Sequence, residues 1–250
     1  MNNTKVSIIM PSYNSMNYIS NSINSVVNQT YESWELIIVD DCSKDDTQHI
    51  VSNYCKNDNR IKLFVNEKNL GSATSRNMGI KKSSGRYIAF LDSDDLWHQD
   101  KLSKQVNFMR LNKYSFTYSY YSKIDEQGLL LKNIDNLPEK VSYISTLKSN
   151  KIGCLTAIYD TEFFGKVYME NLKKRQDLTL WLKLLKENDY AYCCKEILAN
   201  YRIRKNSLSR NKLKLVKFHW LIYRKIEKQN FINSTYYLLF YIYSKIFINK

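Results

Sequence analysis

Short apolar runs and helical patterns alternate along the first hundred residues of the chain. Runs rich in β-branched and other apolar residues are typical of buried strands and lie at residues 5–10, 34–39, 61–65 and 86–91. Apolar residues at helical spacing separate them, such as Ile19, Ile23 and Val26 after the first run. Residues 72–82 form another helical segment before the fourth run. This alternation predicts an α/β fold with a mostly parallel sheet covered by helices on both faces.

The pattern is less regular beyond residue 100. Leu102, Val106 and Met109 indicate a helix, and the runs at 116–124 and 129–131 indicate a hairpin. The remaining expected elements are a strand at 155–159, a helix carrying Leu178, Trp181, Leu182 and Leu185, and helices from residue 212 onward. We therefore expect a main domain over residues 1–210 and a helical tail over 211–250.

Candidate ligand-binding segments follow three of the expected strands, and two of these segments are acidic. Asp92-Ser93-Asp94-Asp95 follows the fourth run, Asp40-Asp41 follows the second, and Pro11-Ser12-Tyr13-Asn14 follows the first. Ligands of open α/β sheets bind outside the carboxyl ends of the strands, so these segments are expected to converge on one cleft. Clustered carboxylates repel one another unless a cation compensates them, and Mg2+ or Mn2+ prefers such oxygen ligands. A solvated turn that caps a helix near Leu96 explains the local spacing about equally well.

Familiar phosphate-binding loops are missing from the sequence. There is no Gly-x-x-x-x-Gly-Lys-Ser/Thr loop, and the glycines at 71, 79 and 85 do not form Gly-x-Gly-x-x-Gly. The calcium-loop pattern fails at Leu96 and Trp97, where an oxygen ligand and a glycine would be needed. A nucleotide bound by this chain would therefore be held through a metal ion and carboxylates.

The order and spacing of several segments resemble family 2 glycosyltransferases, which are Rossmann-like enzymes of the GT-A fold. The resemblance covers about residues 5–210 and rests on Val6–Asn14, Leu36–Ser43, Asn69–Gly71, Arg76–Gly79, Gly85–Asp95 and Arg175–Asp177 before Leu180-Trp181-Leu182. It implies a nucleotide-sugar half at about 1–100 and an acceptor half at about 101–210. The implied activity is inverting, metal-dependent transfer from a UDP-sugar to a glycan or a polyprenyl-diphosphate-linked acceptor. Such transfer belongs to the synthesis of surface polysaccharide, meaning O-antigen, capsule or lipooligosaccharide.

The resemblance also implies a role for each matching residue. The base, usually uracil, is expected to lie against Pro11, Ser12, Tyr13 and Asp41, and the ribose near Asp92 and Ser93. Arg76 is expected to help hold the nucleotide, and Asp94 to bind Mn2+ or Mg2+ at the diphosphate. Asp177 is expected to act as the general base. Transfer builds negative charge on the leaving diphosphate, which a divalent ion stabilises. The acceptor hydroxyl must lose a proton as it attacks, which needs a carboxylate within reach.

Local structural roles compete with several of these assignments. Asp177 precedes a helical stripe and could cap it, Asp40 and Asp41 could make Asx turns, and Arg76 could be a solvated helix residue. The chain departs from the family pattern at Gln176, where Glu is common, and at Cys42, where Gly is common. No Gln-x-x-Arg-Trp motif of processive synthases occurs, which favours the addition of one sugar per encounter.

Charge is concentrated in the tail. The net charge is +14, and residues 195–250 hold 13 basic and only 2 acidic side chains. The basic segment 201–210 is expected to be either a lid over the diphosphate or a solvated loop. Residues 231–248 mix aromatic, apolar and basic residues, which suits the surface of a membrane better than a span. Packing of the tail on the body, or a homodimer contact, is nearly as compatible with this pattern.

Composition limits the other possibilities. Five Cys without a Cys-x-x-Cys pair and three scattered His disfavour a zinc site or a disulfide framework, and no signal peptide is recognisable. We therefore expect a cytoplasmic protein, peripheral on the inner face of the membrane if the tail binds it. A nucleotidyltransferase would place carboxylates similarly but release diphosphate. A nucleic-acid-binding protein would leave the carboxylates unexplained, so no nucleic-acid partner is expected.

Overall fold

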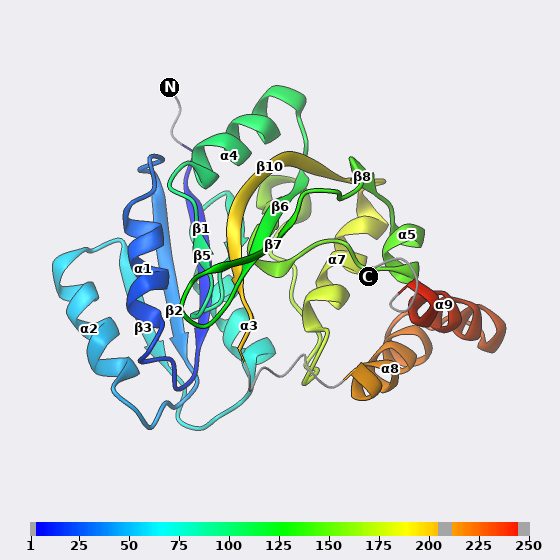
Figure 1. The fold of residues 1–250 in the computed structure, drawn as a ribbon, viewed down its shortest axis with the longest axis horizontal. Helices are drawn as coiled ribbons and strands as arrows, with labels where there is room; N and C mark the ends of the chain where they lie inside the picture. The colour runs from blue at the N-terminus through cyan, green and yellow to red at the C-terminus, as the bar shows by residue number, and fades with distance from the viewer. Residues whose placement is uncertain (1–3, 205–211, 245–250) are drawn as a thin grey trace.

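The fold is built on one mixed sheet. The computed structural model describes residues 4–204 and 212–244, and the strands within them form a ten-stranded sheet in the order β3-β2-β1-β4-β9-β6-β10-β5, with β7 beside β6 and β8 beside β10 (Figure 1). The strands are β1 Val6–Ser12, β2 Trp34–Asp40, β3 Ile61–Val65, β4 Tyr87–Phe90, β5 Leu96–Trp97, β6 Phe116–Ile124, β7 Leu130–Ile134, β8 Lys140–Val141, β9 Ile158–Asp160 and β10 Ala191–Arg202.

The direction of the strands brings several carboxyl ends to one edge. β1 pairs in parallel with β2 and β4, and Ser12 lies opposite Asp40. β9 is antiparallel to both β4 and β6, so β6 runs in the same direction as β4. β10 is parallel to β6, and its last residue, Arg202, lies opposite Ile124. The carboxyl ends of β1, β2, β4, β6 and β10 therefore share the edge at which α/β sheets bind ligands.

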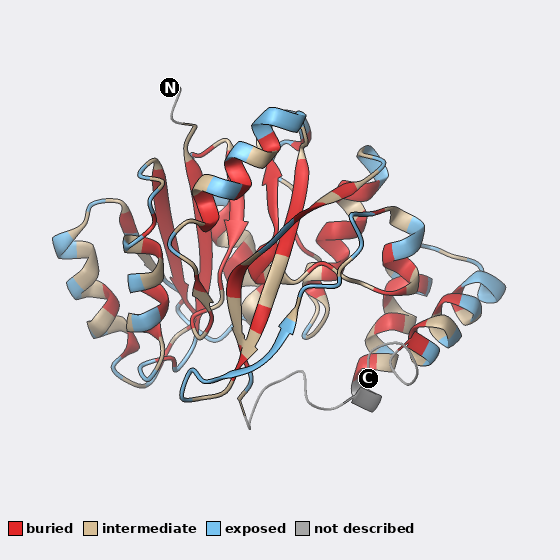
Figure 2. Ribbon diagram, turned by 45° about the horizontal axis from the view of Figure 1, so that its top comes forward, coloured by how far each residue is buried: buried red, intermediate tan, exposed pale blue. Residues whose placement is uncertain are grey.

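Both faces of the sheet are covered, as the alternation of strands and helices predicts. Val6, Ile8 and Met10 of β1 belong to one buried cluster, while Ile9 between them belongs to another. The helices that contribute to the first cluster are α1 Ile19–Val27, α2 Thr47–Asn57 and α4 Lys101–Asn112, and those of the second are α3 Ser72–Lys82 and α7 Gln176–Glu187, with the short helix α6 Thr161–Phe164. Figure 2 shows the resulting buried band along the sheet.

The C-terminal helices pack on the body through a third cluster. They are α8 Lys212–Leu221, a π-helical turn at Ile222–Ile226 and α9 Phe231–Tyr243, and they lie beside α5 Tyr143–Lys148 (Figure 1). Leu147 of α5, Leu178 and Leu182 of α7, Tyr223 and Tyr237 form this cluster. Of the alternatives expected for the tail, packing on the body is therefore observed for one face of α9, and membrane attachment stays a prediction.

The structure corrects the sequence-based elements at three places. No helix starts near Leu96; Leu96 and Trp97 pair with β10, and α4 begins at Lys101. The strand expected at 155–159 is a 3-10 turn at Cys154–Thr156 followed by β9. β10 was not predicted, because the exposed pair Lys195-Glu196 interrupts its apolar pattern.

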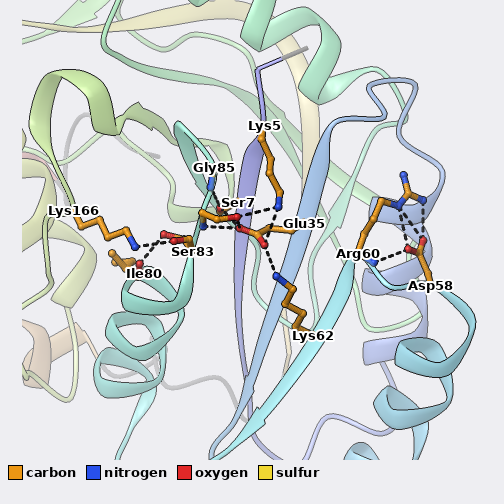
Figure 3. Close-up of polar contacts among 11 residues, drawn as sticks. Lys5, Ser7, Glu35, Asp58, Arg60, Lys62, Ile80, Ser83, Gly85 and Lys166 are labelled. Carbon is orange, nitrogen blue, oxygen red and sulfur yellow. Dashed lines mark hydrogen bonds and ion pairs between the residues drawn. The ribbon is translucent and has the colours of Figure 1, made fainter. Parts of the chain in front are cut away.

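A buried glutamate ties together the starting ends of three strands (Figure 3). Glu35 of β2 is 1% exposed and accepts hydrogen bonds from Lys62 of β3 at 2.8 Å, Ser7 of β1 at 2.7 Å and the Ser84 N–H at 2.7 Å. Burial alone would raise the pKa of this carboxyl, but the hydrogen bonds lower it to about 2. The neighbouring Gly85 is needed for close approach, since a Cβ there would lie 2.7 Å from the Lys5 carbonyl oxygen.

Replacing Glu35 with glutamine is expected to lower the free energy of unfolding at pH 7 by about 2 kcal/mol, after discounting for the partly exposed lysine partners. Because the folded-state pKa is depressed from 4.5 to about 2, this contribution is complete above pH 4.5 and is lost as the pH falls toward 2. Urea denaturation across pH 2–7 measures it, with the exposed Glu32→Gln as control. A difference between wild type and variant that stays constant from pH 5 to pH 2 would contradict the assignment.

Candidate active site

One cavity of about 1030 Å³ opens at the shared edge of the sheet. Its walls come from the ends of β1, β2, β4, β6 and β10, the start of α3, the start of α7, and α8 and α9. All residues that the sequence analysis assigned to the site line it: Pro11, Ser12, Tyr13, Asp41, Arg76, Asp92, Ser93, Asp94 and Asp177. The structure thus brings together side chains that are up to 166 positions apart in the sequence, while their individual roles stay predictions.

The loop after β2 holds Asp41 in a fixed orientation. The Asp41 N–H donates to the Ser12 carbonyl at 2.8 Å, joining the ends of β1 and β2. Its carboxylate accepts hydrogen bonds from Asn66 Nδ2 at 2.7 Å and from the Leu70 and Gly71 N–H groups at 2.8 and 2.7 Å. These donors attach it to the loop before α3, so its orientation is set before any ligand binds.

The residues on either side of Asp41 have local roles. Asp40 is fully buried and accepts hydrogen bonds from the Ser43 N–H and Gln48 Nε2, both at 2.8 Å, which is the turn-forming role considered for it. Cys42 has φ of 65°, a left-handed conformation. This backbone explains why glycine would be favoured at position 42, where the chain departs from the family pattern.

Arg76 forms a buried ion pair in the cavity wall. It lies on α3, is 5% exposed, and its Nη2 is 2.5 Å from Asp92 Oδ1. Burial would lower the pKa of the guanidinium, but the nearby carboxylates of Asp92 and Asp177 contribute to raising it above its usual value. The alternative of a solvated helix residue is wrong for Arg76, because its charge is buried against Asp92.

The segment after β4 concentrates negative charge. Asp94 Oδ2 is 2.6 Å from Arg204 Nε, and buried Asp95 accepts a hydrogen bond from the Arg202 N–H at 2.8 Å. Burial first, and the neighbouring carboxylates second, raise the pKa of both Asp94 and Asp95. Ser93 Oγ lies 2.7 Å from Ser15 Oγ and so links this segment to the loop after β1.

The donor atoms of this segment fit a divalent ion bound mainly through a substrate. Within the part of the chain that the structure describes, no group of three or more His, Cys, Asp or Glu side chains is arranged to hold a metal ion. Asp94 offers carboxylate oxygens to the cavity, and the buried Asp95 Oδ2 has no hydrogen-bond partner among the described residues. In proteins Mg2+ is usually coordinated by one or two carboxylates together with substrate phosphates. The carboxylates at Asp94 and Asp95 match the protein's share of such a site.

Asp177 faces the same cavity from the first turn of α7. The helix begins at Gln176, and neither Asp177 nor the N-cap residue Arg175 makes a side-chain capping bond, so the capping role considered for Asp177 is not the one it adopts. Among residues 4–204 and 212–244, no hydrogen bond or ion pair to the Asp177 carboxylate is found. Gln176, which replaces the common Glu, donates to Ser72 Oγ at 2.7 Å and fastens α7 to the start of α3. A carboxylate without a partner, held by a fixed helix, can accept a proton from a substrate.

Other lining residues were missed by sequence reasoning. Lys151 and Cys154 come from the loop before β9, while Leu215, Tyr241 and Ile242 come from the tail. Their positions depend on long-range packing, and no local motif marks them. In the basic segment 201–210, expected to be either a lid or a solvated loop, Arg202 and Arg204 line the cavity, while residues 205–210 fall outside the described residues.

Comparison with known proteins gives consistent matches. The sequence profile described as "Glycosyl transferase family 2" matches residues 7–168. TuaG of Bacillus subtilis (strain 168), a glycosyltransferase assigned provisionally to teichuronic acid biosynthesis, is 44% identical over 245 residues, covering 98% of this chain and 96% of the relative. The Escherichia coli protein WfgD, named UDP-Glc:alpha-D-GlcNAc-diphosphoundecaprenol beta-1,3-glucosyltransferase, is 42% identical and covers 97% of this chain and 94% of the relative.

Solved structures agree in fold. Residues 1–349 of S. aureus TarS in complex with UDP-GlcNAc superpose with a TM-score of 0.75 at 20% identity, covering 97% of this chain and 73% of that one. The mannosyltransferase PcManGT of Pyrobaculum calidifontis, in complex with GDP-Man and Mn2+, gives a TM-score of 0.67 at 15% identity over 94% of this chain and 70% of that one.

Proposed function

The chain belongs to glycosyl transferase family 2, has the GT-A fold and is a glycosyltransferase, and from that premise we propose that it is an inverting, metal-dependent enzyme that uses a UDP-sugar. The observation that carries the proposal is the convergence of Asp41, Asp94 and Asp177 on one cavity. Relatives named for UDP-sugar chemistry and a fold neighbour bound to UDP-GlcNAc support the choice of donor.

The chain's own residues suit each part of the transfer. The base of the donor lies against Pro11, Ser12, Tyr13 and the oriented carboxylate of Asp41, and Asp92 with Ser93 lies near the ribose. The acceptor oxygen attacks the anomeric carbon from the side opposite the diphosphate, and its proton passes to the Asp177 carboxylate. The bond from the anomeric carbon to the diphosphate oxygen breaks, UDP leaves, and the configuration of the sugar is inverted.

Charge on the leaving diphosphate is balanced at the end of β4 and β10. Asp94 would hold Mn2+ or Mg2+, which when bound would supply Lewis-acid stabilisation of the departing phosphate. Arg204 already lies against Asp94 at 2.6 Å and can turn to the diphosphate once its carboxylate partner is engaged elsewhere. Arg76 is fixed by Asp92 and keeps that carboxylate oriented.

The acceptor is proposed to be a hydroxyl of a glycan carried on a polyprenyl diphosphate, within surface polysaccharide synthesis. Relatives that match nearly their whole length carry names from teichuronic acid and diphosphoundecaprenol-linked pathways. We assign donor binding to about residues 1–100 and acceptor binding to about residues 101–210. The tail contributes to the acceptor side of the cavity through Leu215 and Tyr241.

Incubation of the purified protein with a panel of nucleotide sugars and Mn2+ tests the proposed function. Release of UDP that depends on both an acceptor and a UDP-sugar is expected. A nucleotidyltransferase would instead release diphosphate from a nucleoside triphosphate. An absence of nucleoside diphosphate release from every donor and acceptor tried would contradict the proposal.

The exposed face of α9 is proposed to rest on the inner surface of the cytoplasmic membrane. Ile232, Tyr236, Leu239 and Tyr243 follow one another at helical spacing and are 78%, 50%, 61% and 52% exposed. Lys148 of α5 lies 5.3 Å from the Tyr236 ring, so a cation borders the apolar stripe. Among residues 4–204 and 212–244, no helix has both the length and the apolar character that crossing a bilayer requires. Aromatic and basic residues of this kind suit the interface.

The double variant Ile232→Glu/Leu239→Glu is expected to reduce binding to vesicles of anionic phospholipid by at least about tenfold, because each apolar side chain removed from the interface forfeits roughly 1.5 kcal/mol. Flotation of the protein with vesicles measures this. Leu111→Glu on α4, where Leu111 is 73% exposed, is the control that should float normally. If vesicle binding is unchanged, or if the double variant converts a dimer to a monomer in sedimentation, the face is not a membrane contact.

A further inference from the structure

Basic residues collect in the part of the cavity wall that leads into α7. Lys173, Lys174 and Arg175 form the loop that leads into α7, immediately before the proposed base Asp177. Lys151 lies on the facing loop, and burial lowers the pKa of its ammonium group. Cationic side chains that line one part of a cavity together attract an anion to it. The carboxylates Asp92 and Asp94 already have Arg76 and Arg204 as partners.

Arg175 has a strained backbone and an unsatisfied side-chain donor, two features that are typical of binding residues. It is held at φ of 64°, in the left-handed region that side chains other than glycine seldom occupy. Its Nη2 donates to the Tyr241 hydroxyl at 3.3 Å, but its buried Nε has no hydrogen-bond partner among the described residues. A strained backbone and an unsatisfied charged donor both cost free energy, and a bound anion would compensate the second.

An apolar wall stands directly beside this loop. Leu215 and Val216 of α8 and Ile242 of α9 line the same cavity, and Tyr241 joins them to Arg175. Tyr241 is itself buried and stacks on His219 with ring centres 3.8 Å apart. The outward face of α9 is the exposed apolar stripe described above. Cations and apolar side chains are therefore adjacent within one cavity, and the helix that forms part of its wall also presents an apolar face to solvent.

We propose that Lys173, Lys174, Arg175 and Lys151 bind the diphosphate of a lipid-linked acceptor, while the wall of α8 and α9 receives the first isoprenoid units. This inference rests on the proposed function and adds a second phosphate-binding site to it. Arginine and lysine suit phosphate oxygens, and the apolar wall suits the chain attached to them. A free sugar would need neither feature, and the donor diphosphate is assigned to Asp94. The position of the loop next to Asp177 places the acceptor sugar, which is attached to that diphosphate, near the base.

Calorimetric titration of the UDP-saturated protein with farnesyl diphosphate tests the proposal, because UDP blocks the donor site. Farnesol and inorganic diphosphate, each titrated alone, separate the two halves of the ligand. We expect farnesyl diphosphate to bind at least tenfold more tightly than either. Lys173→Ala/Lys174→Ala should weaken its binding at least tenfold and leave UDP affinity unchanged. The matched control is Lys81→Ala/Lys82→Ala, an adjacent exposed pair at the end of α3 outside the cavity.

The possible results are decisive in either direction. Loss of binding in Lys173→Ala/Lys174→Ala with normal binding in the control supports the proposal. Equal weakening in both double variants would mean that only the overall charge matters, which would overturn the proposal. It would also be overturned if wild type did not bind farnesyl diphosphate, or if Lys173→Ala/Lys174→Ala bound it as tightly as wild type. If the proposed function is wrong, the wild-type protein will not bind UDP. Farnesyl diphosphate is then titrated into the protein without UDP, so that the two failures are distinguished.

Discussion

Asp177→Asn is expected to reduce the rate of sugar transfer by about 10³-fold or more, within the range for loss of a general base. The affinity for UDP-sugar should change little, because Asp177 lies at the start of α7 and makes no hydrogen bond or ion pair with the described residues of the donor side. Asparagine keeps the size of the side chain and removes only its ability to accept the proton. Initial rates of UDP release and calorimetry with the UDP-sugar measure the two quantities.

Two controls make the Asp177 result specific. Glu187→Gln removes a carboxylate from the exposed end of the same helix and should retain full activity. The melting temperature of Asp177→Asn should lie close to that of wild type, since no hydrogen bond or ion pair of Asp177 with a described residue is lost and only its attraction to the buried Arg76 is removed. Transfer at the wild-type rate by Asp177→Asn would remove this residue from the mechanism.

Asp94→Asn is expected to lower transfer by about 10²-fold or more and to abolish the effect of Mn2+ on UDP binding, since the ion stabilises the charge that develops on the diphosphate. Here the loss should appear in donor binding as well as in rate, unlike that of Asp177→Asn. Titration of UDP with and without Mn2+ separates the two cases. In wild type, Mn2+ should increase UDP affinity, and in the variant the two titrations should coincide.

The outcome for Asp94 also bears on Arg204, its partner at 2.6 Å. If the carboxylate served only to hold this arginine, Mn2+ would raise UDP affinity in Asp94→Asn as much as in wild type. Asp135→Asn, which removes an exposed carboxylate outside the cavity, is the control and should leave both titrations unchanged. A manganese response that survives in Asp94→Asn would contradict the assignment of this residue.

The first hundred residues were predictable because their local patterns and their packing agree. Residues of β1 alternate between two buried clusters, so both faces are apolar and the run is easily recognised. The turn residues that follow each strand, such as Asp41, carry the chemistry, and parallel pairing brings them together at one edge. The residues that were assigned from the order and spacing of the motifs all line one cavity, including the distant Asp177.

The acceptor side was much less predictable, for physical reasons. β10 is long but interrupted by exposed polar residues, so its pattern does not resemble a strand. The contribution of Tyr241 depends on α9 packing against the loop before α7, a contact between residues 66 positions apart. The strain at Arg175 has no sequence signal, because arginine is not a residue that favours φ above zero. The tail was interpreted mainly as a surface element, whereas one face of it forms part of the cavity wall.

Diffraction from crystals grown with UDP and Mn2+, with the anomalous signal of manganese recorded, tests the central claim most directly. The account predicts uracil against Asp41, a manganese peak within coordination distance of the Asp94 carboxylate and the diphosphate, and Asp177 facing the position of the missing sugar. UDP bound away from this cavity, or a manganese ion bound without Asp94, would contradict it.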